Sequence, residues 1–333
     1  MNPSDEQPPL RLPEKWLGVP RSISPEARSV LGRAADSPFV WPPYPEAGDI
    51  EGWLHYAAGA NENMRAMFEA LPEAADAAKG EVLDLGAFSC FRFPGDASAS
   101  DGRDNVLFEL HGGALIAGGG DLCRIGAGRL AARTGATVYA PDYRMPPHHP
   151  YPVPLEDCLL AFRHLLASHD PKRVIVHGSS AGGNLAAALI LRLKSERLPL
   201  PAGLVLETPE LDLTESGDTF QTNQIVDVVL QRGLMPVNIL YANGHALEDP
   251  LLSPLFGDFS GGWPVTLLTA GTRDLFLSNA VRMLHRLRAV GAAAELLVYE
   301  AMPHGGFFGT PEDRILQQDV LQFLRRCWAV GGK

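Results

Sequence analysis

One short segment of this chain joins a strand to a helix through a turn that few folds can accommodate. Residues 177–184 read His-Gly-Ser-Ser-Ala-Gly-Gly-Asn and directly follow the apolar run Val174–Val176. In the pattern Gly-x-Ser-x-Gly, only Ser180 has glycines at both flanking positions, Gly178 and Gly182. Such a serine takes a strained backbone conformation that exposes its hydroxyl, and bulky residues at the flanks would clash. The segment therefore predicts a strand–turn–helix unit with Ser180 as a candidate nucleophile.

Short apolar runs alternate with amphipathic segments from residue 106 onward, which is typical of a mostly parallel sheet with helices on both faces. We expect residues 82–93 to add one or two antiparallel edge strands. The strands expected after them are Val106–His111, Thr137–Ala140, Val174–His177, Leu204–Glu207, Val265–Ala270 and Glu295–Tyr299. The helices expected are Asp121–Thr134, Pro154–Ser168, Gly182–Lys194, Asn279–Val290 and Pro311–Trp328.

Two regions depart from this alternation. Residues 1–80 are rich in proline and then helical, and residues 208–250 follow a strand without leading to another one. Because ligands bind at the carboxyl ends of parallel strands, we expect both regions to form a helical cap over Ser180. Residues 81–207 and 251–333 then form the α/β catalytic domain. The helices expected within the two cap segments are Pro25–Ala34, Glu62–Ala78, Asn223–Gln231 and Pro236–Asn243.

The charge and apolar content exclude several classes of partner. A chain of 333 residues with a net charge of -11 lacks the basic surface that nucleic acids and anionic membranes require. No apolar run approaches the ~18 residues of a membrane span, and the N-terminus lacks the features of a signal peptide. The four cysteines form no metal-ligand spacing and are interpreted as buried thiols in a reducing compartment. We expect a cytoplasmic protein with no nucleic-acid or membrane partner.

A serine hydroxyl needs a base within hydrogen-bond reach and a group that orients this base. Asp274 follows the expected strand Val265–Ala270, and His304 lies among glycines after the expected strand Glu295–Tyr299. Both strands should end at the sheet edge that carries Ser180. Serine, acid and histidine also stand in a chain order known for such triads. We therefore expect Ser180, Asp274 and His304 to form a catalytic triad.

Serine attack on a carbonyl group also requires N–H donors for the oxygen that becomes negative. Ala181, directly after the candidate nucleophile, supplies one. The segment His111–Ala114 follows the strand that starts at Val106, and its glycines lack a Cβ. The N–H groups of Gly112, Gly113 and Ala181 are therefore the expected oxyanion hole.

The histidines provide no evidence for a metal. None of the ten forms a His-Glu-x-x-His or similar ligand pattern. His111 and His177 stand at the ends of expected strands and are interpreted as structural. We expect neither a metal nor another cofactor.

With these residues placed, residues 80–330 resemble the bacterial hormone-sensitive lipase family of carboxylesterases, which has the α/β-hydrolase fold. The resemblance is carried by His111–Ala114 for the family's H-G-G-G, by Gly178–Asn184 for the elbow, and by residues 142–157 for its D-Y-R-x-x-P-E-H-P-F-P segment. Asp274 and His304 match its acid and base positions. It implies hydrolysis of short- to medium-chain esters through an acyl-enzyme, a cap made of two segments, and a homodimer formed by the C-terminal strand and helix.

The chain departs from the family pattern at three places. Ala114 replaces the last glycine of H-G-G-G, Ser179 stands where Asp or Thr is common, and Pro147-His148 stands where Glu is more frequent. Only the first bears on the substrate, because the Ala114 methyl group narrows the acyl pocket or tilts the loop. The side chains expected to line that pocket are Ala114, Leu115, Ile116, Phe220 and Phe307.

Two other functions fit the same residues in part. A lactonase or an amidase would use the same triad, and only the cap and the acyl pocket separate them from an esterase. A receptor-like, non-catalytic binding protein of this fold would keep the scaffold and lose the base. The presence of Ser180, Asp274 and His304 disfavours it, so the expected partner is a small-molecule ester.

Overall fold

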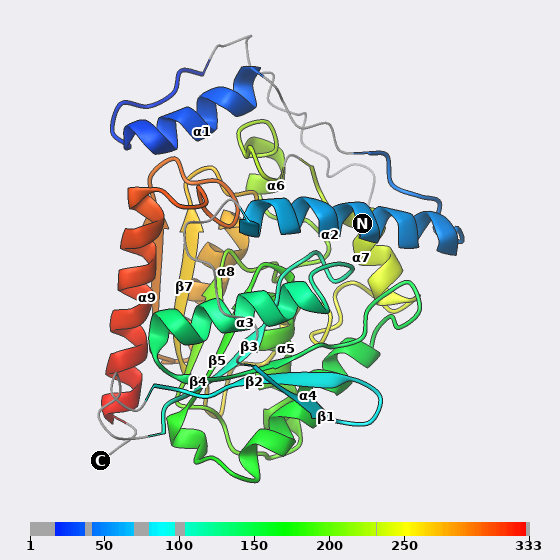
Figure 1. Ribbon diagram of the computed structural model, residues 1–333, viewed down its shortest axis with the longest axis vertical. Coiled ribbons are helices and arrows are strands. Elements are labelled where there is room, and N and C mark those ends of the chain that lie inside the picture. The colour runs from blue at the N-terminus through cyan, green and yellow to red at the C-terminus, as the bar shows by residue number, and fades with distance from the viewer. Residues whose placement is uncertain (1–16, 37–41, 70–79, 97–103, 231, 331–333) are drawn as a thin grey trace.

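The computed structural model describes residues 17–36, 42–69, 80–96, 104–230 and 232–330. Within these residues, eight strands form one sheet in the order β1-β2-β4-β3-β5-β6-β7-β8 (Figure 1). The strands are β1 (Glu81–Asp84), β2 (Ser89–Phe93), β3 (Val106–Leu110), β4 (Thr137–Pro141), β5 (Val174–Ser179), β6 (Gly203–Glu207), β7 (Val265–Gly271) and β8 (Ala294–Tyr299).

The sheet is parallel from β4 to β8 and antiparallel at one edge, where β1 pairs with β2 and β2 with β4. This confirms the expected α/β fold, and of the one or two antiparallel edge strands that we expected, there are two. In the parallel part, Leu110 pairs with Gly178 and Ser179 pairs with Glu207. The carboxyl ends of β3, β5 and β6 therefore meet beside Ser180.

Helices cover both faces of the sheet because successive strand residues point to opposite sides. Val174 and Val176 contact an apolar cluster with α4 (Val153–Leu166), α5 (Ala181–Ser195) and α8 (Leu277–Ala289). Ile175 contacts the opposite cluster, which is formed with α1 (Pro25–Asp36), α3 (Asp121–Thr134) and α9 (Pro311–Val330). The predicted strands and the main helices are confirmed within a few residues. Two short 3₁₀ turns, η2 (Pro171–Arg173) and η3 (Pro254–Phe256), complete this part.

The predictions for the two irregular regions are less accurate. Helix α2 covers Ile50–Glu69, so it begins before the predicted Glu62, and residues 70–78 lie outside the described part. The predicted helix at Asn223–Gln231 is wrong: α6 covers Thr219–Thr222 and turns follow. The Asp227 carboxylate accepts the N–H groups of Val229 and Leu230, and this local bonding competes with a helix. Helix α7 covers Met235–Ala242, close to its predicted range.

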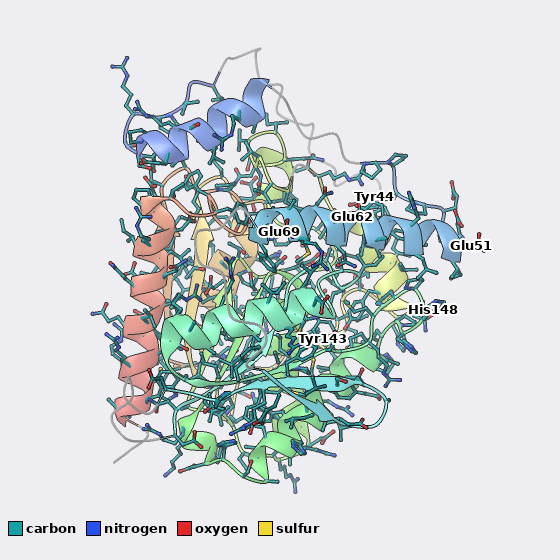
Figure 2. The ribbon with its side chains drawn as sticks, in the orientation of Figure 1. Tyr44, Glu51, Glu62, Glu69, Tyr143 and His148 are labelled. Carbon is teal, nitrogen blue, oxygen red and sulfur yellow. The ribbon has the colours of Figure 1, made fainter. Side chains whose placement is uncertain are left out.

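The N-terminal region and the region 208–250 contact each other beyond the carboxyl ends of the strands (Figure 1). They share a third apolar cluster, made of Trp53, Ile116, Ala117, Phe220, Leu230, Leu234, Val237, Leu275 and Phe276. At its margin the Tyr44 hydroxyl donates to the carbonyl oxygen of Gly233 at 3.0 Å, and the Arg232 guanidinium lies 3.7 Å from the Tyr44 ring centroid. Tyr44 lies beside α2 (Figure 2). Segments far apart in sequence thus pack together above the sheet.

Two smaller expectations concern the cysteines and the membrane. Cys90, Cys123, Cys158 and Cys327 are all buried free thiols, as predicted. Among the helices of the described ranges, none combines the length and the apolar character needed to span a bilayer.

Candidate active site

Strand β5 passes directly into helix α5 at Ser180, whose φ is 55° and ψ -120°. This conformation is strained for a residue with a side chain, and it is possible here because both flanking residues are glycines. A Cβ on Gly178 would lie 2.3 Å from the carbonyl oxygen of Gly182, and a Cβ on Gly182 would lie 1.9 Å from that of Leu110. The two glycines therefore let the turn pack against the end of β3.

The three residues of the predicted triad lie within hydrogen-bond distance of one another. His304 Nε2 is 2.9 Å from Ser180 Oγ, and His304 Nδ1 is 2.9 Å from Asp274 Oδ1. Asp274 follows β7 and is fully buried, and His304 follows β8. Because a carboxylate only accepts, Nδ1 donates to Asp274, and Nε2 is left to accept the serine proton.

The charges around His304 favour its protonated form. Burial alone would lower its pKa, but the charge of Asp274 and its hydrogen bond, with smaller effects of Asp227 and Glu210, raise the pKa of His304 above its usual value. Two further buried acids face this region. Burial raises the pKa of Asp227 to about 6 and that of Glu210 to about 8. A raised pKa favours the uncharged form of an acid, so an imidazolium formed during a reaction would be stabilised mainly by Asp274.

Asp227 is a site residue that sequence reasoning missed. It lies in the region 208–250, and its carboxylate accepts the backbone N–H of His304 at 3.2 and 3.3 Å and that of Leu275 at 2.9 Å. These two residues are the base itself and the neighbour of Asp274. An aspartate in a loop is an ordinary feature of a sequence, and only its burial, at 1% exposure, distinguishes this one.

The predicted oxyanion loop lies against the nucleophile. A Cβ on Gly112 would be 2.9 Å from the carbonyl oxygen of Ser179 and 3.3 Å from Ser180 Cβ. Among the described residues, none accepts a hydrogen bond from the N–H of Gly112 or Gly113. Ala181 is the first residue of α5, where N–H groups have no acceptor within the helix. Donors are thus free around the serine hydroxyl.

The predicted pocket residues belong to three different apolar clusters. Ile116 and Phe220 belong to the third apolar cluster, and Ala114 packs against it. Leu115 lies in the cluster on the α5 side of the sheet, whereas Phe307 lies in the cluster with α9. Phe276, which the sequence did not indicate, packs edge-on against the His304 ring with centroids 4.8 Å apart.

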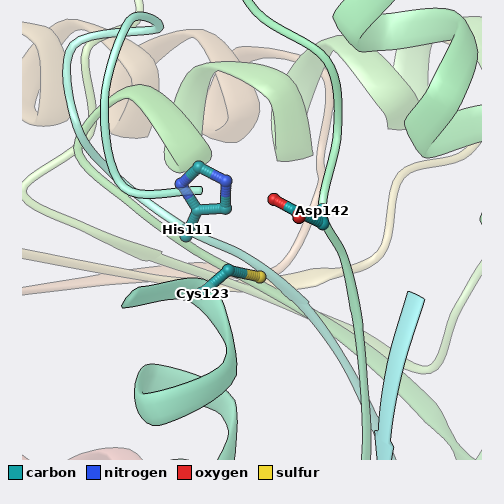
Figure 3. A group of neighbouring side chains, drawn as sticks. All are labelled: His111, Cys123 and Asp142. Atoms are coloured by element: carbon teal, nitrogen blue, oxygen red, sulfur yellow. The ribbon is translucent and has the colours of Figure 1, made fainter. Parts of the chain in front are cut away.

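The two histidines interpreted as structural, His111 and His177, differ in their neighbours. His177 is buried between Glu109 and Glu207 on neighbouring strands; burial opposes its charge, but both carboxylates raise the pKa of His177 to about 10. It therefore cross-links β3, β5 and β6 as a cation. His111 instead lies near Cys123 and Asp142, and one ligand atom from each is within 4.8 Å of the others (Figure 3).

Comparisons with known proteins show the family of this chain. A model of the α/β-hydrolase fold family matches residues 107–308. An esterase of Acinetobacter venetianus is 32% identical over 210 residues, which cover 62% of this chain and 69% of that protein. An acetyl-hydrolase of Streptomyces hygroscopicus is 35% identical over 182 residues, covering 54% of this chain and 60% of that one.

Solved structures match over nearly the whole chain. The crystal structure of esterase E25 has a TM-score of 0.80 at 29% identity and covers 95% of this chain and 98% of its own. The structure of an esterase from the bacterial hormone-sensitive lipase family has a TM-score of 0.74 at 30% identity, covering 92% and 99%. The likeness extends beyond the sheet to the regions that pack above it.

Proposed function

Since this chain belongs to the α/β-hydrolase fold family and is a carboxylic ester hydrolase of the bacterial hormone-sensitive lipase type, we propose that it cleaves short- to medium-chain esters through an acyl-enzyme on Ser180. The observation that carries the proposal is the continuous chain of hydrogen bonds from Asp274 through His304 to Ser180. A buried acid, an oriented imidazole and a partly exposed hydroxyl in this order form the arrangement that activates a serine.

In the proposed mechanism, Ser180 Oγ attacks the ester carbonyl carbon while His304 Nε2 takes the hydroxyl proton. The negative oxygen is held by the N–H groups of Gly112, Gly113 and Ala181, of which the two glycine donors have no other acceptor among the described residues. His304 then gives its proton to the leaving alcohol. A water molecule deprotonated by His304 releases the acid and restores Ser180.

We also propose that the N-terminal region 1–80 and the region 208–250 act as a cap that shapes the substrate site. The contacts between Tyr44 and the segment Arg232–Gly233 support this, because they join the two regions above the strand ends. The acyl chain would lie among Ala114, Ile116 and Phe220. This apolar wall favours an ester with a small or medium acyl group over a charged substrate.

Two smaller proposals concern location and assembly. The four free, buried thiols fit a reducing cytoplasm. The exposed edge strand β8, on which Val298 is 45% exposed, would pair with that of a second copy in a homodimer. Light scattering coupled to size-exclusion chromatography measures the mass of the protein in solution and so distinguishes a homodimer from a monomer.

The test of the function is a series of initial rates on p-nitrophenyl esters from acetate to palmitate, with lactones and amides beside them. We expect the highest kcat/KM at short or medium chains. The Ser180→Ala variant should lose at least ~10⁴-fold in kcat, as triad removals do. Normal turnover in this variant would exclude the mechanism. A preference for lactones or amides would assign the same triad to another substrate class.

A further inference from the structure

Three potential metal ligands from different elements meet at the base of the oxyanion loop. His111 directly follows β3, Cys123 lies in the first turn of α3, and Asp142 directly follows β4. One ligand atom of each lies within 4.8 Å of the others. Figure 3 shows the imidazole edge, the thiol and the carboxylate around a common space. Their sequence separation explains why no ligand motif is visible in the chain.

The hydrogen bonds of His111 leave one ring nitrogen as a bare acceptor in this space. Nδ1 lies 2.8 Å from the carbonyl oxygen of Gly112, which can only accept, so Nδ1 carries the proton. Nε2 then has a lone pair, and among the described residues it has no hydrogen-bond partner although the residue is only 9% exposed. Burial lowers the pKa of His111, which keeps the ring neutral. A histidine that donates one N–H to a backbone carbonyl is oriented as metal-bound histidines are.

Asp142 adds a second acceptor toward the same space. The N–H of Gly120 donates to its Oδ1 at 2.8 Å, which leaves Oδ2 for another partner. The lone pair of His111 Nε2 and an oxygen of Asp142, both acceptors, therefore face each other within 4.8 Å. This arrangement is unfavourable until a cation fills it.

We propose that His111 Nε2, Cys123 Sγ and an Asp142 carboxylate oxygen bind one thiophilic divalent cation, with Zn²⁺ as the best match. Nitrogen, sulfur and oxygen are the ligand set that zinc prefers, and a fourth position is left for water. A thiolate and a carboxylate neutralise the two positive charges. In a tetrahedral zinc site the ligand atoms are about 3.5 Å apart, so the side chains have to close by about 1 Å.

Binding requires a proton to leave. The Cys123 thiol is protonated in the free protein, because burial raises its pKa well above the usual value. Its S–H group makes only weak hydrogen bonds, to the carbonyl oxygens of Ala140 and Pro141. On binding, the S–H bond breaks, an S–Zn bond forms, and the proton passes to solvent. Asp142 is partly exposed and lies beside the exposed Gly120, which gives both the proton and the cation a route.

The turn over the cluster has no side chains that would block this route. A Cβ on Gly118 would lie 2.7 Å from His111 Nδ1, and a Cβ on Gly119 would lie 2.9 Å from Asp142 Oδ1. An occupied site would tie the ends of β3 and β4 to the start of α3, directly before Gly112. It would therefore hold the oxyanion loop in place, whichever substrate the enzyme takes.

The first experiment is calorimetric titration of the chelator-treated, reduced full-length protein with Zn²⁺, followed by titration with Cd²⁺ monitored through the ultraviolet thiolate-to-cadmium band. We expect one equivalent of either ion in the wild type. The Cys123→Ser variant should bind at least tenfold more weakly and lack the band. Cys327→Ser is the matched control, because Cys327 is also a buried free thiol, and it should behave as the wild type.

Equal zinc binding by the wild type and Cys123→Ser would overturn the proposal, and so would the absence of a stoichiometric site in the wild type. If Cys123→Ser does not fold, zinc K-edge X-ray absorption of the wild type loaded with one equivalent decides. One sulfur neighbour with nitrogen or oxygen ligands supports the site, whereas a shell of only nitrogen and oxygen overturns it. None of these readouts depends on esterase activity.

Discussion

Replacing Asp227 by asparagine should impair the active site without touching the triad. Asp227 Oδ1 accepts the N–H groups of Val229 and Leu230 at 2.9 and 3.0 Å, and Oδ2 accepts that of Leu275 at 2.9 Å. The backbone N–H of His304 lies between both oxygens, at 3.3 and 3.2 Å. An asparagine side chain keeps the shape but replaces one of these acceptors by an NH₂ donor.

The size of the effect follows from this hydrogen-bond count. If the amide oxygen takes the place of Oδ1, the Leu275 N–H loses its acceptor; in the opposite orientation, Val229 and Leu230 lose theirs. Each unsatisfied buried donor reduces the free energy of unfolding by about 1–3 kcal/mol. A domain with a typical stability of about 5–15 kcal/mol survives such a loss. The native fold should therefore persist with a lowered Tm.

The variant should affect the catalytic rate more than the stability of the fold. The Asp227 carboxylate holds the backbone of His304 and of the residue after Asp274, and a 1 Å displacement of a catalytic group can reduce the rate about 100-fold. We expect kcat to fall about 10- to 100-fold with a smaller change in KM. The variant also removes a negative charge that raises the pKa of His304, so the acid limb of kcat/KM should move to lower pH.

The assay combines thermal unfolding with pH profiles of kcat/KM on a short p-nitrophenyl ester. Asp157→Asn is the matched control, because Asp157 is a buried carboxylate that accepts the backbone N–H and the guanidinium of Arg144 rather than groups of the triad loops. It should lose stability while kcat and the acid limb stay unchanged. An Asp227→Asn variant that loses stability but keeps the wild-type kcat and acid limb would refute a positioning role.

Three further predictions follow from the same geometry. Asp274→Asn should reduce kcat by about 10⁴-fold while the fold is retained, because a neutral amide does not stabilise the imidazolium, and its NH₂ group, where it faces Nδ1, stabilises the wrong tautomer of His304; circular dichroism and single-turnover rates check both parts. In the wild type, the acid limb of kcat/KM should lie above the usual histidine pKa of about 6.5, because the free enzyme needs neutral His304 and the pKa of His304 is raised; a limb at or below 6.5 would contradict this. Gly182→Ala should destabilise the fold by more than about 3 kcal/mol, since its Cβ would lie 1.9 Å from a backbone oxygen. Gly126→Ala in α3, where a Cβ meets nothing within 4 Å, should be neutral or stabilising by up to about 1 kcal/mol in denaturant titrations.

Local patterns in the sequence were sufficient to predict the sheet and the strand–turn–helix unit at Ser180. The run before Gly178 is apolar on both strand faces, as a strand buried on both sides requires. The close packing of the turn at Ser180 requires glycine at positions 178 and 182, because a Cβ there would meet a backbone oxygen. Asp274 and His304 could be placed because the carboxyl ends of parallel strands share one edge. Their place at this edge could be predicted from the order of the strands along the chain, without any interatomic distance.

The two regions outside the alternation were predicted less well. The segment after Asn223 has helical spacing, but the Asp227 side chain bonds its own backbone and that of the triad loops. Helix α2 begins earlier than its pattern indicated. The Asp49 carboxylate caps the helix by accepting the N–H of Gly52 at 2.9 Å, a signal that sequence reasoning missed, and Trp53 is buried in the third apolar cluster. Propensity is a weak guide where tertiary contacts decide the conformation.

By itself, then, the sequence determined which residues could react and in which order the strands present them, because turn chemistry and hydrophobic periodicity are local. Only the tertiary structure decided which polar groups support them. The bonds from Asp227 to His304, and the meeting of His111, Cys123 and Asp142, join residues that no local pattern connects. The hydrogen bonds and the ligand-binding capacity of these polar groups depend on their burial and on which neighbours they have, and both are properties of the packed chain.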